Sequence, residues 1–131
     1  MIYNEKYRIK FYRNSRTGNR PVRDYIHHLE YRQRTKIYKY LEYLRDHGGY
    51  LDEPYSRHIV SGIRELRVDF SNHHHRLLYF CFIGRTIVIL HAFLKKVDKT
   101  PPREINTALG RYYEIINNCA ELYEEENIQS R

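Results

Sequence analysis

The sequence predicts an α+β domain, in the order β-α-α-β-β-β-α, whose helices pack against one face of an antiparallel sheet. Two observations predict this class. Residues 63–95 contain three apolar runs with strand-like spacing, separated by turns short enough for hairpins. Two helical repeats precede these runs, and a third follows the double proline at 101–102. Because one face of an antiparallel sheet can remain solvated, we expect the second face to be open and basic.

The first expected elements are a strand and a short helix. In residues 7–12 apolar side chains occupy every second position, which is the period of a half-exposed strand. The turn-rich stretch NSRTGN follows. Pro21 suits the first turn of a helix, and apolar residues then recur at helical spacing from Val22 to Leu29.

A second helix is expected from the spacing of Ile37, Leu41 and Leu44, and it ends at the glycine pair 48–49. Its remaining surface is basic. The cations concerned are Arg32, Arg34, Lys36 and Lys39. We expect them to face solvent, with contact to RNA as the alternative.

Three strands are expected at 63–70, 76–83 and 86–95. In the first, Leu66, Val68 and Phe70 face the core, and Glu65, Arg67 and Asp69 face the other way. In the third strand, Val88, Leu90, Ala92 and Leu94 form one uniformly apolar side. Phe93 and Lys95 are then expected on the open face with Glu65 and Arg67. Both alternating sets of the middle strand are apolar, so the side on which Arg76 lies stays open.

The last helix is expected to begin at Pro101 and Pro102, with Thr100 as its cap. Its buried stripe comprises Ile105, Ala108, Leu109, Tyr112 and Ile116. Residues from about 121 onward are rich in glutamate and predict a flexible acidic tail. We expect residues 1–131 to form a single domain.

The chain of 131 residues has a formal net charge of +7. Residues 121–131 contain four glutamates and one arginine, a balance of -3, so residues 1–120 carry +10. This excess favours a polyanionic partner: RNA, DNA, an anionic membrane or an acidic protein. If Arg76 reaches the open face, that face combines cations, an aromatic ring and a carboxylate, a mixture that suits RNA.

The sequence also indicates the compartment. Cys81 and Cys119 are too few and too far apart for a thiolate metal site, and we expect both to be reduced and buried. The N-terminus shows no signal-peptide core, and the run TIVILHAFL is too short to span a bilayer. We therefore expect a soluble, cytoplasmic protein with no membrane partner.

Four stretches together resemble the HigB/RelE superfamily of bacterial toxins, in particular its phage-derived HigB-like branch. These are FYRNSRTGNRPVRDYIHHL, SGIRELRV, HRLLYF and IVILHAFLKKVDKTPPREINTAL. They match that branch's first strand and helix, then G-x-x-E-L-R, R-x-x-Y and H-x-F-x-K-K-x-x-K-T-P-x-x-E-I-x-x-A. The resemblance covers roughly residues 3–111 and rests on the combined order and spacing of the motifs.

The resemblance implies a RelE-like fold and the toxin of a type II toxin-antitoxin system. Such a toxin is an endonuclease that cuts mRNA in the ribosomal decoding site, against ribosomal RNA. Its partner is a cognate antitoxin, often one with a helix-turn-helix domain. The 2′-hydroxyl of the RNA attacks the adjacent phosphate, so the resemblance implies neither a metal nor another cofactor. The alternative is a non-catalytic RNA- or ribosome-binding protein that retains antitoxin binding.

Carried over by position, the resemblance implies that Arg76, Lys95 and Arg67 are catalytic residues at the scissile phosphate. Glu65 either acts as a base or holds Arg67 or Arg76. The second role is favoured because an adjacent guanidinium keeps a carboxylate ionised and weakly basic. Lys95 and the neighbouring Lys96 could equally form an ordinary solvated strand end.

The expected RNA-binding residues are Phe93, Lys96, Arg64 and His91. Phe93 would stack on a base, although a phenylalanine is more often part of the core. Strict alternation would turn Lys96 toward the opposite face. His91 is also a candidate for catalysis, although a histidine bonded within the sheet is commoner. Residues 73–75 are three histidines in an expected turn, where one could act as a general base and a metal site is not expected.

Overall fold

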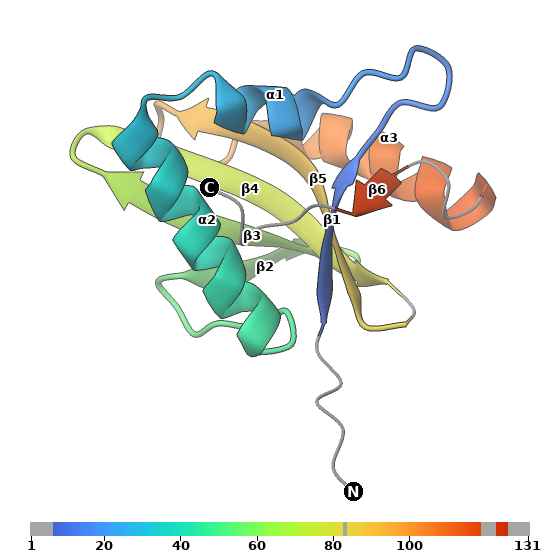
Figure 1. Cartoon of the computed structure of the whole chain (residues 1–131), viewed down its shortest axis with the longest axis horizontal. Helices are drawn as coiled ribbons and strands as arrows, with labels where there is room; N and C mark the ends of the chain where they lie inside the picture. Colours follow the sequence, from blue (N-terminus) through green and yellow to red (C-terminus); the bar gives the residue numbers. More distant parts are fainter. Residues whose placement is uncertain (1–6, 83, 119–122, 126–131) are drawn as a thin grey trace, which may run out of the picture.

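The computed structural model describes residues 7–82, 84–118 and 123–125 (Figure 1). Within these ranges the chain forms a mixed α+β fold. The strands are β1 (Arg8–Tyr12), β2 (Ser56–Val60), β3 (Ile63–Phe70), β4 (His73–Phe82), β5 (Thr86–Lys95) and β6 (Tyr123–Glu125). The helices are α1 (Pro21–His27), α2 (Tyr31–Asp46) and α3 (Pro102–Asn118).

The described strands form one sheet in the order β2-β3-β4-β5-β1-β6. Strands β2 to β5 are an antiparallel meander, as expected. β1 lies parallel to β5, with Ile9 opposite Ile87, so the sheet is mixed and the prediction of an antiparallel sheet was wrong at this pair. The chain passes through α1, α2 and three strands before it returns beside β1, and that long connection permits parallel pairing.

Two short edge strands were not expected. β2 pairs only with β3, and a register shift lies between His58 and Val60. β6 pairs antiparallel with β1 and lies within the acidic segment that begins at about residue 121. Residues 119–122 and 126–131 lie outside the described residues.

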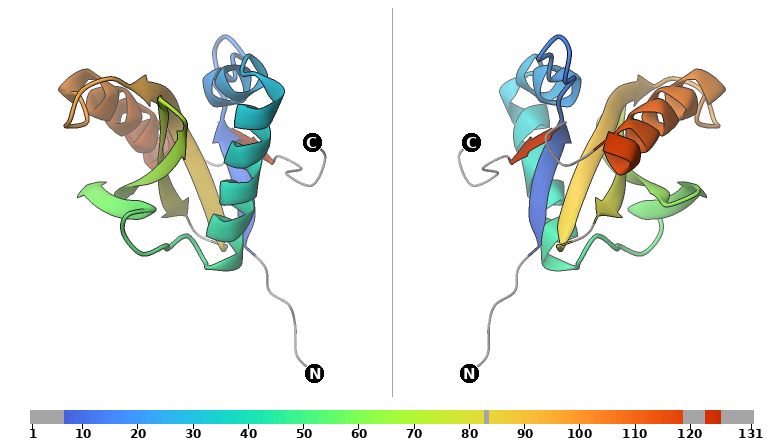
Figure 2. Two further views of the ribbon diagram at one scale, coloured as in Figure 1. Left: turned by 90° about the vertical axis from the view of Figure 1, so that its left-hand side faces the viewer. Right: turned by 90° about the vertical axis from the view of Figure 1, so that its right-hand side faces the viewer.

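Helices cover both faces of the sheet, whereas the sequence predicted helices on one face. Figure 2 shows α3 on one side and α1 with α2 on the other. Under α1 and α2 the core is built on residues such as Ile26, Leu41 and Leu77. Under α3 a second, smaller core contains Leu78, Phe93 and others. The second face is therefore open only where α3 does not reach.

A β-bulge in β5 changes which side chains face α3. Leu78 lies opposite His91 and Tyr79 opposite Ile89, so Leu90 is the extra residue. Beyond the bulge Val88 joins Leu90 in the core under α3. The predicted uniform side from Val88 to Leu94 was therefore wrong, because alternation is interrupted at Leu90.

The end of α2 explains the environment of Cys81. Gly49 has a φ of +88° and donates its N–H to the carbonyl of Leu44, which ends the helix. A Cβ on Gly49 would collide with the sulfur of Cys81, so this position has no room for another residue. Cys81 was predicted to be buried but is exposed, since it lies next to the last residue of β4, at the end of the strand. Cys119 lies outside the described residues.

Candidate functional site

A hollow of about 730 Å³ lies on the part of the second sheet face that α3 leaves uncovered. It is at the end of the sheet where β3 turns into β4 and β5 leaves the sheet. Its polar lining on three adjacent strands includes Arg67, Asp69, His74, Arg76 and Lys95, and Asn72 and His73 also line it near the turn from β3 to β4. Residues 96–98, just after β5, form part of its rim. We call this feature the hollow.

Pairing across the sheet brings the three predicted cations together. Arg67 lies opposite Arg76, and Arg76 lies opposite Phe93, two residues before Lys95. The three side chains therefore share one face, which fixes the side of Arg76 that the sequence left open. Within the described part of the chain, neither Arg67 nor Lys95 forms a side-chain hydrogen bond or ion pair. Both charges are available to an anionic ligand.

The positive charge of the hollow affects the pKa of Lys95. Partial burial, followed by the charge of Arg76, lowers the pKa of this ammonium group from its ordinary value. Arg67 and Arg57 act in the same direction, and Glu65 opposes them. The cations of the hollow repel one another, and a bound anion would relieve this repulsion.

Arg76 lies beneath the surface of the hollow, with 4% of its side chain exposed. Its Nη1 donates to Asp69 Oδ1 at 2.8 Å and to the carbonyl of His75 at 2.9 Å. Its buried Nε has no hydrogen-bond partner among the described residues. Burial to this degree does not fit the predicted direct contact of Arg76 with a phosphate. It fits a guanidinium group that contributes positive charge from beneath the surface of the hollow and holds Asp69 in place.

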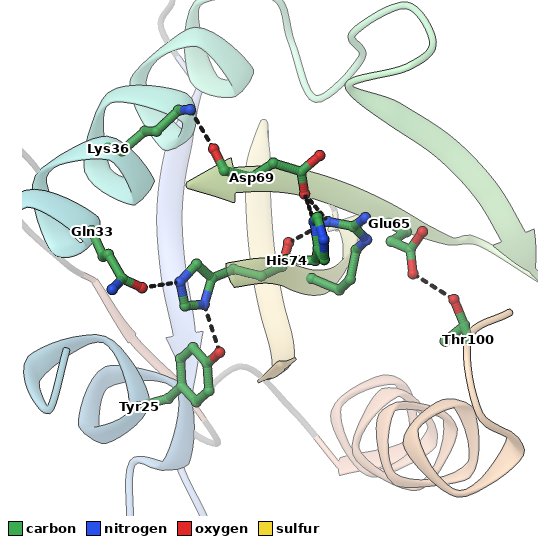
Figure 3. A network of polar contacts seen from close by, with 9 residues as sticks. Tyr25, Gln33, Lys36, Glu65, Asp69, His74 and Thr100 are labelled. Atoms are coloured by element: carbon green, nitrogen blue, oxygen red, sulfur yellow. Dashed lines mark hydrogen bonds and ion pairs between the residues drawn. The ribbon is translucent and has the colours of Figure 1, made fainter. Parts of the chain in front are cut away.

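Asp69 connects the strands at the floor of the hollow. Its Oδ1 accepts from both Arg76 and Nδ1 of His74, the latter at 3.1 Å, and its carbonyl oxygen accepts from Lys36 on α2 (Figure 3). Partial burial acts to raise the pKa of Asp69, but the bonds from Arg76 and His74 outweigh it and hold the pKa below its ordinary value. Asp69 is therefore an ionised, fixed acceptor.

The three histidines at 73–75 begin β4 rather than forming the expected turn. The turn is the pair 71–72, where Ser71 has a φ of +55°. Alternation then directs His74 to the hollow and His75 toward α1 and α2. His75 is buried between the hydroxyl of Tyr25 at 2.7 Å and Gln33 Oε1 at 2.6 Å (Figure 3). Burial, followed by the charge of neighbouring His73, lowers the pKa of His75 to about 4, so it is neutral near pH 7.

Glu65 is 1% exposed and does not line the hollow. Its Oε2 accepts a 2.6 Å hydrogen bond from Thr100 (Figure 3). Thr100 was expected to cap α3, but its hydroxyl is committed to Glu65, and α3 begins at Pro102. The bond ties the segment before α3 to the middle of β3. Glu65 therefore holds Thr100, whereas the sequence predicted that it holds Arg67 or Arg76, and its burial argues against a role as base.

His91 and Phe93 lie under α3 rather than in the hollow. His91 Nε2 is 2.6 Å from Glu104 Oε1, and burial lowers the pKa of His91 although Glu104 opposes that shift. Arg111 on α3 reaches the other ring nitrogen of His91 at 3.4 Å. Phe93 is 6% exposed and stacks against His91. The expectation that Phe93 stacks on a base does not fit this burial.

Lys96 and Arg64 fall in different places. Lys96 is exposed and lines the hollow beside Lys95, because β5 ends at Lys95 and strict alternation no longer applies. Arg64 faces the α2 side of the sheet, where its Nε donates to Ser56 at 3.1 Å. Its guanidinium also lies over the ring of Tyr50 at 4.7 Å. Arg64 is therefore not part of the hollow.

Sequence reasoning missed the pair formed by Asp69 and His74. The signal was present in the period of β3, which places Asp69 on the same side as Arg67. A two-residue turn then brings His74 directly opposite Asp69. The polar run around residues 71–75 suggested a longer loop, which concealed this pairing.

The basic surface of α2 is only partly free. Lys36 donates to the carbonyl of Asp69, and Arg34 donates to the carbonyls of His27 and Leu29. Within residues 7–82, 84–118 and 123–125, no three His, Cys, Asp or Glu side chains are arranged to hold a metal ion. In the same ranges no helix is long and apolar enough to cross a membrane.

The fold and the hollow define an α+β protein with a basic, concave end to one sheet face. The family model for phage derived protein Gp49-like (DUF891) matches residues 24–113, which include every side chain named in the hollow. The chain therefore belongs to this Gp49-like family, which is part of the RelE/HigB-like toxin superfamily. A comparison with curated proteins found no match to the chain.

Proposed function

We propose that this protein is the toxin of a type II toxin-antitoxin system, within the HigB-like branch, and that it cuts mRNA on the ribosome. One observation carries the proposal. Arg67 and Lys95, free of side-chain partners in the described chain, face one hollow above the buried charge of Arg76. This is an arrangement for an anion with several oxygens, such as a phosphodiester. Membership of the Gp49-like family supports the same class.

The proposed reaction uses the RNA's own nucleophile. The 2′-oxygen attacks the adjacent phosphorus, a new 2′-O–P bond forms, and the bond from phosphorus to the 5′-oxygen breaks. The products are a 2′,3′-cyclic phosphate and a free 5′-hydroxyl. The pentacoordinate state carries extra negative charge, which fixed cations stabilise more strongly than they stabilise the starting diester. This route requires no metal or other cofactor.

We assign different roles to the predicted residues. Lys95 and Arg67 contact the scissile phosphate, and Lys96 contacts the RNA backbone at the rim. Arg76 and Glu65 act as positioning residues, the first through Asp69 and the second through Thr100. Because Lys95 is placed at the scissile phosphate, we also assign it the protonation of the leaving 5′-oxygen, a role that its lowered pKa favours.

The proposal includes two partners. The substrate is mRNA in the decoding site, where ribosomal RNA holds it against the hollow. The other partner is a cognate antitoxin, with a helix-turn-helix protein as the expected type, and the site of action is the cytoplasm. A toxin of this class needs such a partner because unrestrained cleavage of mRNA stops growth.

A second function is a non-catalytic RNA or ribosome binder that retains antitoxin binding. The buried position of Arg76 and the placement of Phe93 under α3 favour it, since two predicted contacts to RNA are withdrawn. Both functions predict binding to ribosomes that weakens with salt. Only the first predicts cleavage.

Induced expression without antitoxin tests the proposal. We expect growth arrest and new 5′ ends inside translated reading frames, detected by primer extension. A matched message that differs only in its start codon, and is therefore not translated, should stay intact in the same cells. Intact translated mRNA with unchanged growth would contradict the endonuclease and leave the binder.

A further inference from the structure

The side chain of His74 projects into the hollow and has one fixed partner. Its Nδ1 lies 3.1 Å from Asp69 Oδ1, and 48% of the His74 side chain is exposed. The ring lines the hollow from β4, which lies between β3 with Arg67 and β5 with Lys95. The roles assigned under the proposed function do not use His74, although the sequence offered one of residues 73–75 as a general base.

Asp69 fixes both the tautomer and the orientation of this ring. Because Asp69 is held ionised by Arg76, its Oδ1 accepts the proton on Nδ1 of His74. In the neutral ring Nε2 is then the acceptor, and no described residue bonds to it. Arg76 and Lys36 in turn hold Asp69 from β4 and from α2. The acceptor nitrogen is therefore oriented by contacts from three elements.

We propose that His74, oriented by Asp69, is the general base of the RNA cleavage reaction. This inference rests on the proposed function and names the group that function leaves unassigned. Nε2 of His74 takes the proton of the 2′-hydroxyl as the 2′-O–P bond forms. The 5′-oxygen leaves with a proton from Lys95. After the reaction His74 has gained one proton and Lys95 has lost one. Exchange with water then restores both groups.

The other titratable groups nearby are less suited to this role. Glu65 is sealed by burial and its bond to Thr100, and His91 is held by Glu104 beneath α3. Asp69 is committed to two donors, which makes it a weak base. His73 and Asp98 reach the rim, but neither is fixed by a hydrogen bond from a described residue.

Charged groups from each neighbouring element surround His74. They are Asp69 on β3, Arg76 on β4 and Lys95 on β5, with Lys96 and Asp98 on the rim of the hollow. A general base must be unprotonated to accept the proton of the 2′-hydroxyl, so the rate of cleavage should rise with pH.

The test measures single-turnover cleavage of a labelled message on purified ribosomes between about pH 5.5 and pH 8.5. We expect His74→Gln to cut about 100- to 10,000-fold more slowly than wild type and to lose the rise of rate with pH. His28→Gln, the matched control at an exposed histidine at the end of α1 and away from the hollow, should behave as wild type. Added imidazole should restore part of the cleavage by His74→Gly, which a merely structural role of His74 would not allow.

A second measurement separates catalysis from binding. Ribosomes carrying a message with a 2′-deoxynucleotide at the mapped cut should bind wild type and His74→Gln equally well. Cleavage by His74→Gln at the wild-type rate, with the same pH profile, would overturn the assignment of His74 alone. A wild-type protein that binds these ribosomes but cuts no message at any pH would overturn the proposed function together with it.

Discussion

The Lys95→Ala variant is expected to fold and to bind ribosomes, yet to cut mRNA about 100- to 1,000-fold more slowly than wild type. Lys95 is the last residue of β5 and is only half-buried at the hollow, so truncation of its side chain leaves the core intact. In the proposed mechanism, the lost ammonium group removes both a contact to the developing charge and the acid for the leaving oxygen. Single-turnover cleavage and the thermal unfolding midpoint measure the two expectations.

Lys96→Ala is the matched control for Lys95→Ala. It removes the same charge one residue later, at a site that is exposed on the rim. We expect its cleavage rate to stay within a factor of about ten of wild type, because a solvated backbone contact contributes little to the transition state. Equal losses for the two variants would show that the hollow acts only through its general positive charge.

The wild-type protein is expected to lose stability as the pH falls from 6.5 toward 4, and the His75→Gln variant should lose less. His75 has an ordinary pKa of 6.5 when unfolded and a pKa of about 4 when folded. Between these values the unfolded chain binds the additional proton, so acid favours unfolding. The resulting loss of stability is about 2–3 kcal/mol by pH 4 and is absent above the unfolded pKa.

Urea unfolding at several pH values measures this difference. The glutamine side chain of the variant is neutral throughout, so the change in unfolding free energy between pH 7 and pH 4 should be smaller in the variant by about 2 kcal/mol. His28→Gln is the control, since His28 is exposed at the end of α1. If wild type and His75→Gln lose equal stability with acid, the buried network of His75, Tyr25 and Gln33 does not hold a neutral ring.

The alternation of polar and apolar residues in β3, together with the prolines that mark the starts of α1 and α3, was enough to predict where much of the hollow lies. Alternation in β3 put Arg67 and Asp69 on one side, and Lys95 followed from the end of β5. These predictions succeeded because one side of β3 is polar and the other is apolar. Where a strand is covered on both sides, the same reasoning had less to use.

The bulge at Leu90 shows this limit. Helices cover both sides of β5, so an extra apolar residue leaves no trace in the pattern. The apolar stripe of α3 predicted that the helix packs on the sheet but did not indicate which face it covers. The burial of Arg76 could not be predicted either. It depends on the hydrogen bond to Asp69 on β3, and the register between β3 and β4 is fixed only by the two-residue turn that joins them.

The most direct test of the account is the effect of a single oxygen atom in the substrate. Ribosomes carrying an all-RNA message and ribosomes carrying the same message with one 2′-deoxynucleotide at the mapped cut are incubated with the wild-type protein. We expect the first message to be cut to a 2′,3′-cyclic phosphate and the second to remain intact at that position. Equal cleavage of both would contradict the proposed attack by the 2′-hydroxyl, and with it the assigned role of the hollow.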